Sequence, residues 1–390
     1  MNNFDYYKPT RFIFGRDTEN QVGELVKEYH GTKVLLVYGG GSAVRSGLVG
    51  NVQKYLQASG IEYVTLGGVQ PNPLDTLVYK GIEICKKENV DFMLAVGGGS
   101  VIDTAKAIAI GSKYEGDFWD FYAHKATAKS ALPVATISTI AAAGSEGSNS
   151  SVITQASTRL KRGVNSEFII PTFAILNPVL TMTLPEYQTS CGITDMLAHI
   201  QERYFTNTKG VTLTDYMCEG SMKAIITEAY KLMENPSDYD ARANIMWAGV
   251  IAHNNSLGLD RDQDWASHKI EHELSGMFDV AHGAGLAIIF PAWMKYVMHH
   301  DLNRFVQYAN RVWNVEVDYN DLEMTALKGI NQYENFLKDI HMPTRLSDIG
   351  VKKEDIDKLI AKYEVGMPKA LGGFVKLSVD DIRHIYELAL

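Results

Sequence analysis

The residues best suited to chemistry are histidines that crowd into one short stretch of the chain. Of the 11 histidines, His268, His272 and His282 lie within fifteen positions. Upstream, Asp195 and His199 stand four residues apart, which on a helix places both side chains on one face. Neutral imidazoles together with one carboxylate suit a borderline divalent ion such as Zn²⁺ or Fe²⁺. The sequence therefore predicts a metal site formed by these side chains.

One ion reaches both His268 and His282 only if the chain folds back between them. In a continuous helix these residues would lie roughly 21 Å apart along the axis. We expect Gly276 and the sequence DVAHG that follows to end the helix and reverse the chain. The spacing leaves open whether His268 or His272 is the ligand, and the other would relay protons or be a solvated helix residue. The upstream Asp–His pair, taken alone, is also common on helices that bind no metal.

Three glycines and a serine end one apolar run and begin a helical pattern: Gly97, Gly98, Gly99 and Ser100. Glycines allow backbone N–H groups to approach a ligand closely, and the start of a helix adds further donors and partial positive charge. This combination suits the pyrophosphate of a dinucleotide. A tight strand-to-helix turn would require the same glycines, so the motif alone does not choose between the two.

A second glycine loop follows an earlier apolar run and comprises Gly39, Gly40, Gly41 and Ser42. Dinucleotide-binding proteins often carry an acidic residue there for the ribose 2′-hydroxyl, and its absence leaves room for a 2′-phosphate. This loop has no carboxylate, and Arg45 follows it closely. We therefore predict that NADP(H) is preferred over NAD(H), although a plain turn with a solvated arginine fits the same residues. The hydroxyls of segment 136–146 would line the same nucleotide site or a close-packed turn.

The apolar patterning divides the chain into two parts. Up to about residue 180, apolar runs alternate with amphipathic stretches, which is typical of β-α-β units and a parallel sheet covered on both faces. The expected strands are 33–41, 62–68, 92–100, 132–140 and 172–178, with helices at 48–60, 73–90 and 100–111. Further on, a 3.6-residue period predicts helices at 217–234, 240–258, 264–276, 302–313, 322–340 and 379–390. We predict an α/β domain over 1–180 and an all-helical domain over 181–390.

Composition excludes several classes of protein. The net charge of the 390-residue chain is −9 and its basic residues are scattered, which argues against nucleic-acid binding. The first residues show no secretory signal, and no apolar run reaches the ~18 residues that a membrane span needs. The cysteines Cys85, Cys191 and Cys218 form neither a disulfide framework nor a cysteine-rich metal site. We expect a cytoplasmic protein that binds a small molecule, and neither a nucleic acid nor a membrane.

These motifs together resemble a known family. The sequences PTRFIFG, VQPNP, AVGGGSVIDTAKAIA, NPVLTMTLP, GITDMLAH and QDWASHKIEHELSGMFDVAHGAG are similar to those of the iron-containing, or group III, alcohol dehydrogenases. The resemblance covers nearly the whole chain and is strongest to the branch of NADPH-dependent butanol dehydrogenases and broad aldehyde reductases. It implies a Rossmann-like N-terminal domain, an all-helical C-terminal domain of dehydroquinate synthase-like architecture, and a homodimer.

The resemblance also assigns roles to individual residues. It implies that the metal ligands are Asp195, His199, His268 and His282, and that His272 is a catalytic histidine. The cofactor-binding residues that it implies, together with the loop 39–42 and Arg45, are Asn72, Gly97, Gly98, Gly99, Ser100, Asp103, Ser138, Thr139, Lys161 and Leu180. One departure is Ala143, which stands before Gly144 where relatives often have threonine. The lost hydroxyl would weaken a contact near the nicotinamide.

The implied reaction interconverts short-chain aldehydes such as butanal and primary alcohols. The metal would act as a Lewis acid and the nicotinamide would carry the hydride. A glycerol dehydrogenase-like polyol oxidoreductase is the nearer alternative. A dehydroquinate synthase-like lyase would need several basic residues near the metal, and segments 195–204 and 264–285 contain only Arg203 and Lys269. A metal-storage protein would have no use for two glycine-rich nucleotide loops.

Overall fold

The computed structural model describes residues 1–142, 144–365 and 370–390, and these form two compact units. The sheet unit is Tyr7–Leu184, and the helical unit combines Met1–Tyr6 with Pro185–Leu390. The division therefore falls at Leu184, a little beyond the expected residue 180. The first residues group with the helical unit because the Asn2 N–H donates to the Asp260 carbonyl at 2.7 Å.

The sheet unit contains a parallel six-stranded sheet in the order β1-β8-β5-β4-β2-β3. In that order the strands are Arg11–Phe14, Phe173–Leu176, Val134–Ser138, Phe92–Gly97, Lys33–Gly39 and Glu62–Val69. Two further strands, β6 (Ser150–Thr154) and β7 (Lys161–Asn165), form a separate antiparallel pair. The sequence predicts five of the six parallel strands, but not the short edge strand β1 or the antiparallel pair.

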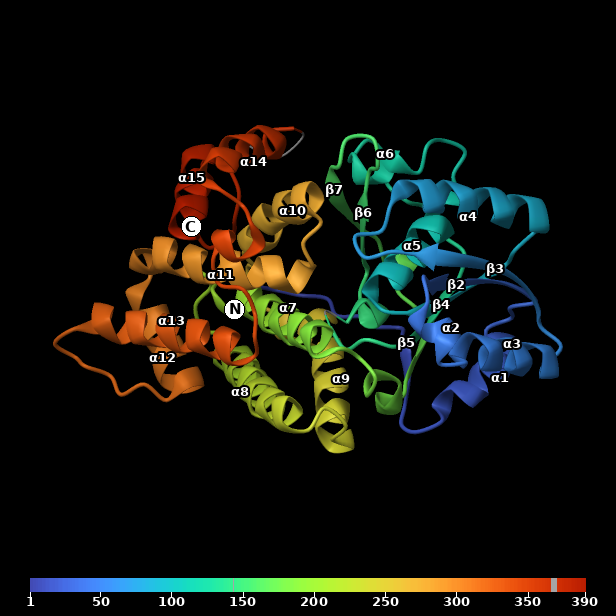
Figure 1. Ribbon diagram of the computed structural model, residues 1–390, viewed down its shortest axis with the longest axis horizontal. Coiled ribbons are helices and arrows are strands. Elements are labelled where there is room, and N and C mark those ends of the chain that lie inside the picture. Colours follow the sequence, from blue (N-terminus) through green and yellow to red (C-terminus); the bar gives the residue numbers. More distant parts are fainter. Residues whose placement is uncertain (143, 366–369) are drawn as a thin grey trace. The chain divides into compact units, whose positions relative to one another are not determined.

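Alternating residues of each inner strand are buried on opposite faces of the sheet. Leu35 and Val37 of β2 pack in the core formed with α4 (Asp75–Glu88) and α5 (Gly99–Gly111). Val34 and Leu36 pack in the core formed with α1 (Val22–Glu28) and α3 (Leu48–Ala58). Figure 1 shows the two pairs of helices on the two sides of the sheet. This arrangement explains the continuous apolar runs that identify the strands in the sequence.

The strand order reverses between β2 and β4. The chain passes from β2 to its neighbour β3 on one side, and then returns to β4, β5 and β8 on the other side. Open parallel sheets bind ligands beyond the carboxyl ends of their strands at such a reversal. The register pairs Tyr38 with Val96 and Gly97 with Ser138, so the segments that follow β2, β4 and β5 begin side by side.

The helical unit is built around α7, which is buried at every position from Thr189 to Tyr204. Its helices are α7 (Glu186–Tyr204), α8 (Thr212–Glu234), α9 (Tyr239–His253), α10 (Ala266–Phe278), α11 (His282–Val297), α12 (Leu302–Trp313), α13 (Leu322–Asp339), α14 (Ile356–Tyr363) and α15 (Val379–Leu388). Helix α7 packs against α8, α9 and α11. Within the described residues, no helix has the length and apolar character needed to cross a bilayer.

Candidate metal centre and nucleotide loops

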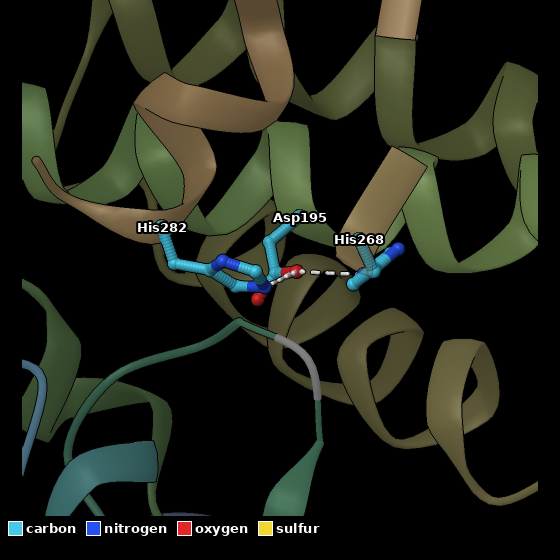
Figure 2. Close-up of side chains that lie close together, drawn as sticks. All are labelled: Asp195, His268 and His282. Carbon is cyan, nitrogen blue, oxygen red and sulfur yellow. Dashed lines mark ion pairs between the residues drawn. The ribbon is translucent and has the colours of Figure 1, made fainter. Parts of the chain in front are cut away.

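Three helices bring the candidate metal ligands together. Asp195 and His199 lie on α7, His268 on α10, and His282 is the first residue of α11. The Nε2 atoms of the three histidines lie 3.4, 3.7 and 3.8 Å from Asp195 Oδ1, in chain order. Figure 2 shows the side chains of Asp195, His268 and His282 directed at one another. Tetrahedral ligands at 2.0–2.1 Å from a metal are roughly 3.3 Å apart, so these separations are close to those of a coordination site.

Unpaired polar atoms support a cation at this position. Asp195 Oδ1 and His268 Nε2 are buried and have no hydrogen-bond partner among the described residues. Such atoms are rare in folded proteins because they lose their interactions with water without replacement. The ligand atoms of Asp195, His268 and His282 all lie within 4.8 Å of one another. His199 adds a fourth donor, because its Nε2 lies 3.4 Å from Asp195 Oδ1. A divalent ion at this point would satisfy the orphaned atoms, so the donor set fits the metal.

The electrostatics of the centre favour positive charge at His268. Burial opposes protonation of this imidazole, yet the neighbouring carboxylates of Asp195 and Glu202 raise its pKa to about 9. Burial lowers the pKa of His199 well below the usual value for histidine, and repulsion from the neighbouring His253 and His268 lowers it further. A neutral His199 can offer a lone pair, whereas His268 lies where two carboxylates attract either a proton or a metal ion.

The turn between α10 and α11 brings His282 back to α7. The sequence predicts that Gly276 and the DVAHG segment that follows (279–283) end the helix and reverse the chain. Gly276 itself is buried within α10, which continues to Phe278. The chain reverses at Asp279, whose φ of 55° is the left-handed conformation that ends many helices. Asp279 tolerates this conformation because its short polar side chain can bond locally. The predicted reversal is therefore present, and it falls at the first residue of the DVAHG segment.

Two glycines allow α11 to begin very close to its neighbours. A Cβ atom on Gly283 would lie only 2.1 Å from the Cys191 carbonyl oxygen of α7, and one on Gly285 would lie 2.6 Å from Glu271 Oε1. Any larger residue at position 283 would have to displace backbone. The sequence HGAG after the turn is thus explained by close packing, and this packing carries the His282 imidazole to Asp195.

Sequence reasoning missed two carboxylates that contact the candidate ligands. Glu202 Oε1 lies 3.0 Å from His268 Nδ1, and Glu271 Oε2 hydrogen-bonds with His282 Nδ1. Both glutamates are 0% exposed. Their spacing gave a usable signal, because Glu202 lies two helical turns after Asp195 and Glu271 lies one turn after His268, on the same helix faces.

His272 and an aromatic ring lie beside the four candidate ligands. The His272 ring is partly buried, and its centroid is 5.7 Å from that of His282. On the other side, the Trp265 ring is centred 5.3 Å from His199 and 5.2 Å from His268. Trp265 has a φ of 67°, an uncommon conformation for a bulky residue, and its ring also lies under the Arg203 guanidinium at 4.7 Å.

The expected pyrophosphate loop lies at the strand reversal of the sheet unit. Gly98 is the N-cap of α5, and a Cβ there would lie 2.7 Å from Ile140. A Cβ on Gly99 would meet nothing within 4 Å, so the start of α5 leaves space on that side for a ligand. The Thr139 N–H donates to the Gly97 carbonyl at 3.1 Å. The candidate residues gathered at this edge are Gly97, Gly98, Gly99, Ser100, Ser138 and Thr139.

The loop after β2 carries Arg45 against its glycines. Helix α2 (Ser42–Arg45) follows directly. A Cβ on Gly41 would lie 2.1 Å from Arg45 Nη1, which places the guanidinium on the glycine backbone. A Cβ on Gly40 would meet no atom within 4 Å. The loop therefore combines open space at Gly40 with a positive charge, as a 2′-phosphate would require.

The remaining candidate cofactor residues have protein partners of their own. Asn72 Oδ1 accepts a hydrogen bond from Lys161 Nζ at 3.0 Å, so these two expected contacts lie together. Asp103 accepts from Ser145 Oγ at 2.7 Å and from the Val152 N–H at 2.9 Å, and burial raises its pKa. Asp103 thus ties the segment after β5 to α5. Leu180 packs against the sheet core, and Ala143 lies outside the described residues.

Two family models together match nearly the whole chain. Residues 9–178 match the family described as iron-containing alcohol dehydrogenase, and residues 189–390 match the C-terminal domain of the Fe-containing alcohol dehydrogenase family. The chain belongs to the iron-containing alcohol dehydrogenase family. The predicted family is confirmed.

Individual relatives are similar over their whole length. The probable NADH-dependent butanol dehydrogenase 1 of Bacillus subtilis is 42% identical, with 100% of both chains covered. The structure of NADH-dependent butanol dehydrogenase A from Thermotoga maritima matches with a TM-score of 0.97 and 40% identity, covering 100% of this chain and 99% of that one. The Escherichia coli NADPH-dependent aldehyde reductase YqhD is 34% identical, with 100% of both chains covered. The structural match confirms the predicted fold class. The two more similar relatives are named for NADH and YqhD is named for NADPH, so the names do not establish the expected NADPH preference.

Proposed function

We propose that this protein is a metal-dependent alcohol dehydrogenase and aldehyde reductase. It transfers hydride between a nicotinamide dinucleotide and a short-chain aldehyde or primary alcohol of the butanal and butanol type. The observation that carries this proposal is the convergence of three imidazole Nε2 atoms on Asp195 Oδ1 at 3.4–3.8 Å. Membership of the family and the names of the relatives support the substrate class.

The four ligands of the proposed centre are Asp195, His199, His268 and His282. A bound Fe²⁺ or Zn²⁺ would supply Lewis-acid polarisation of a carbonyl oxygen. Because the ligand set combines three neutral imidazoles with one carboxylate, its charge leaves a divalent ion net positive. Asp195 contributes the only negative charge among the ligands, and its Oδ1 is buried, so water does not screen it.

His272 is the proposed proton-transfer residue. Its ring lies one helical turn after His268, and its centroid is 5.7 Å from that of His282. It is partly exposed, so it can exchange protons with water, unlike the buried His268. The unperturbed pKa of histidine lies near neutrality, which suits an imidazole that gives a proton to a forming alcohol and takes one from an alcohol that is being oxidised.

The nicotinamide dinucleotide is proposed to bind at the strand reversal of the sheet unit. Its pyrophosphate would lie at the start of α5, where Gly99 leaves open space and the helix dipole favours negative charge. The Arg45 guanidinium against Gly41, in a loop without carboxylates, favours NADPH over NADH. The names of the relatives favour NADH, so a direct comparison of the two cofactors must decide the preference.

Substrate comparison tests the reaction class. We expect protein loaded with Fe²⁺ or Zn²⁺ to oxidise NADPH or NADH with butanal, and to reduce NADP⁺ or NAD⁺ more efficiently with butanol than with glycerol. Efficient glycerol oxidation with weak butanol oxidation would favour the polyol alternative. A lyase would need free basic side chains near the metal, and segments 195–204 and 264–285 contain only Arg203 and Lys269. Arg203 is buried and donates to the His199 carbonyl at 2.6 Å, so the lyase role is disfavoured.

We propose that the enzyme is a homodimer, as the family resemblance implies, and that it acts in the cytoplasm, which its scattered free cysteines favour. Light scattering after gel filtration measures the first directly. A mass of one chain, near 43.3 kDa, would contradict the homodimer, and a mass near twice that value would support it.

A further inference from the structure

We propose that Glu202 and Glu271 are positioning residues that select Nε2 of His268 and of His282 as the metal-binding atoms, and that the two glutamates differ in what else they stabilise. The inference rests on the proposed metal centre. It concerns residues that are absent from the predicted ligand set and that contact two of its members through buried carboxylates.

Glu202 serves both an imidazole and a helix end. Its Oε1 lies 3.0 Å from His268 Nδ1 and accepts the His268 backbone N–H at 3.1 Å. Its Oε2 accepts the Trp265 N–H at 2.7 Å. These amides lie at the start of α10, where helix N–H groups lack intrahelical partners and negative charge is stabilising. Loss of this carboxylate would therefore disturb α10 as well as the imidazole.

Glu271 contacts side chains at the turn between α10 and α11. One oxygen hydrogen-bonds with His282 Nδ1, and the other accepts the Ser275 hydroxyl. Ser275 Oγ also donates to the Val280 carbonyl at 3.0 Å, which links the carboxylate to the turn itself. Glu271 lies inside α10, away from its first turn, so it does not cap the helix as Glu202 does.

The two contacts determine which ring nitrogen is free to bind a metal. A neutral imidazole carries one N–H, and a carboxylate beside Nδ1 keeps the proton on that atom. The lone pair is then on Nε2, and these are the atoms that lie 3.7 and 3.8 Å from Asp195 Oδ1. His199 lacks this control, since its Nδ1 is buried without a hydrogen-bond partner among the described residues. Two of the three imidazoles are thus oriented by carboxylates.

The measurable consequence is metal affinity. Removal of a carboxylate behind a ligating histidine typically costs about 10- to 100-fold in affinity. We expect Glu271→Gln to lose Zn²⁺ affinity in this range while the melting temperature of the metal-free protein changes little. We expect Glu202→Gln to lose both affinity and melting temperature. Both variants should alter the visible absorption spectrum of the Co²⁺-substituted protein, because each leaves an imidazole free to rotate or to change its tautomer.

Glu219→Gln is the matched control. Glu219 is also buried, but its carboxylate accepts from the hydroxyl of Tyr204 at 2.8 Å and from Gln307 at 2.8 Å, with Arg311 nearby at 3.3 Å. This variant should lower the melting temperature and leave Zn²⁺ affinity and the Co²⁺ spectrum unchanged. It separates loss of a buried carboxylate in general from loss of one behind a ligand.

Competition with a chelator for Zn²⁺, metal analysis and the Co²⁺ spectrum require no substrate, so they are independent of turnover. If the unaltered protein binds one ion and both variants keep its affinity and spectrum, the positioning role is wrong and the proposed function stands. If the unaltered protein binds no ion, the proposed function fails first. Binding of two ions per chain would also overturn the inference, because Glu271, His272 and His282 form a second group with metal-ligand spacing, and Glu271 would then be a ligand.

Discussion

At the scale of single residues, His268 shows most clearly how the centre is tuned. Its imidazole lies between Asp195 at 3.7 Å and Glu202 at 3.0 Å. These contacts prevail over burial and raise its pKa to about 9. In the metal-free protein a proton therefore occupies the position that a metal ion would take, and the two cations compete.

Metal affinity should consequently depend on pH. The pKa of His268 is about 9 in the folded chain, against 6.5 for a free imidazole, so its protonation stabilises the metal-free fold below pH 6.5 and this stabilisation is lost as the pH rises through 9. Since metal binding releases that proton, Zn²⁺ affinity should rise by up to about tenfold per pH unit until about pH 9. Chelator competition at several pH values measures this. A flat affinity between pH 7 and pH 9 would contradict the pKa assigned to His268.

Arg45 tests the cofactor preference. Replacement by alanine removes the guanidinium from Gly41, and a lost hydrogen bond to a charged group typically costs about 1.5–3 kcal/mol. We expect Arg45→Ala to raise KM for NADPH roughly 10- to 100-fold and to leave KM for NADH nearly unchanged. Lys54→Ala, on the exposed surface of α3, is the control. Equal effects of Arg45→Ala on both cofactors would show that Arg45 does not bind a 2′-phosphate.

At the scale of elements, close packing of α11 on α7 places His282. Gly283→Ala would put a Cβ 2.1 Å from the Cys191 carbonyl oxygen, and overpacking of this kind costs about 1–3 kcal/mol. We expect this variant to lower both the melting temperature and Zn²⁺ affinity. Gly220→Ala, in the exposed part of α8 where a Cβ meets nothing within 4 Å, should instead stabilise the protein slightly. Unchanged Zn²⁺ affinity in Gly283→Ala would show that the metal centre does not depend on the close packing of α11 on α7.

A buried lysine fixes the segment after β5 to α5 in the sheet unit. Lys106 Nζ donates to the carbonyl oxygens of Ser145, Ser148 and Ser150 at 2.6, 2.9 and 2.9 Å, while burial lowers its pKa to about 8. Lys106→Met would leave these carbonyls unpaired, and each unpaired buried group costs about 1–3 kcal/mol. Denaturant unfolding should therefore show a loss of several kcal/mol. A loss below about 1 kcal/mol would mean that the segment finds other partners.

The sequence predicts some elements well and misses others for identifiable reasons. Five strands form apolar runs because both of their faces are buried, and the sequence therefore predicts them: β2, β3, β4, β5 and β8. Helix α11 was not expected because Gly283, Gly285 and Pro291 all disfavour helices in isolation, and only its tertiary packing explains them. Helix α7 (Glu186–Tyr204) is likewise not among the helices that the periodicity predicts, because a helix that is buried at every position from Thr189 to Tyr204 lacks an amphipathic pattern.

At the scale of the whole molecule, the division into two units follows from the change of hydrophobic period, and the structure places it at Leu184. The candidate ligands could be named from residue type and local spacing. Their convergence could not be derived from periodicity, because it depends on the reversal at Asp279 and on the contact of α11 with α7. Glu202 and Glu271 share helix faces with Asp195 and His268, which is a signal in the sequence, but an acidic residue on a helix is ordinary until its partner is known.

We propose that a metal held by Asp195, His199, His268 and His282 supports the alcohol dehydrogenase activity of this protein. The most direct test follows NADPH and NADH absorbance with butanal, using protein as purified, after removal of metal, and after addition of Fe²⁺ or Zn²⁺. We expect activity to be lost when the metal is removed and to return with either ion, and we expect the His268→Ala variant, which lacks a proposed ligand, not to recover. Activity that is unchanged by complete metal removal would contradict the proposal.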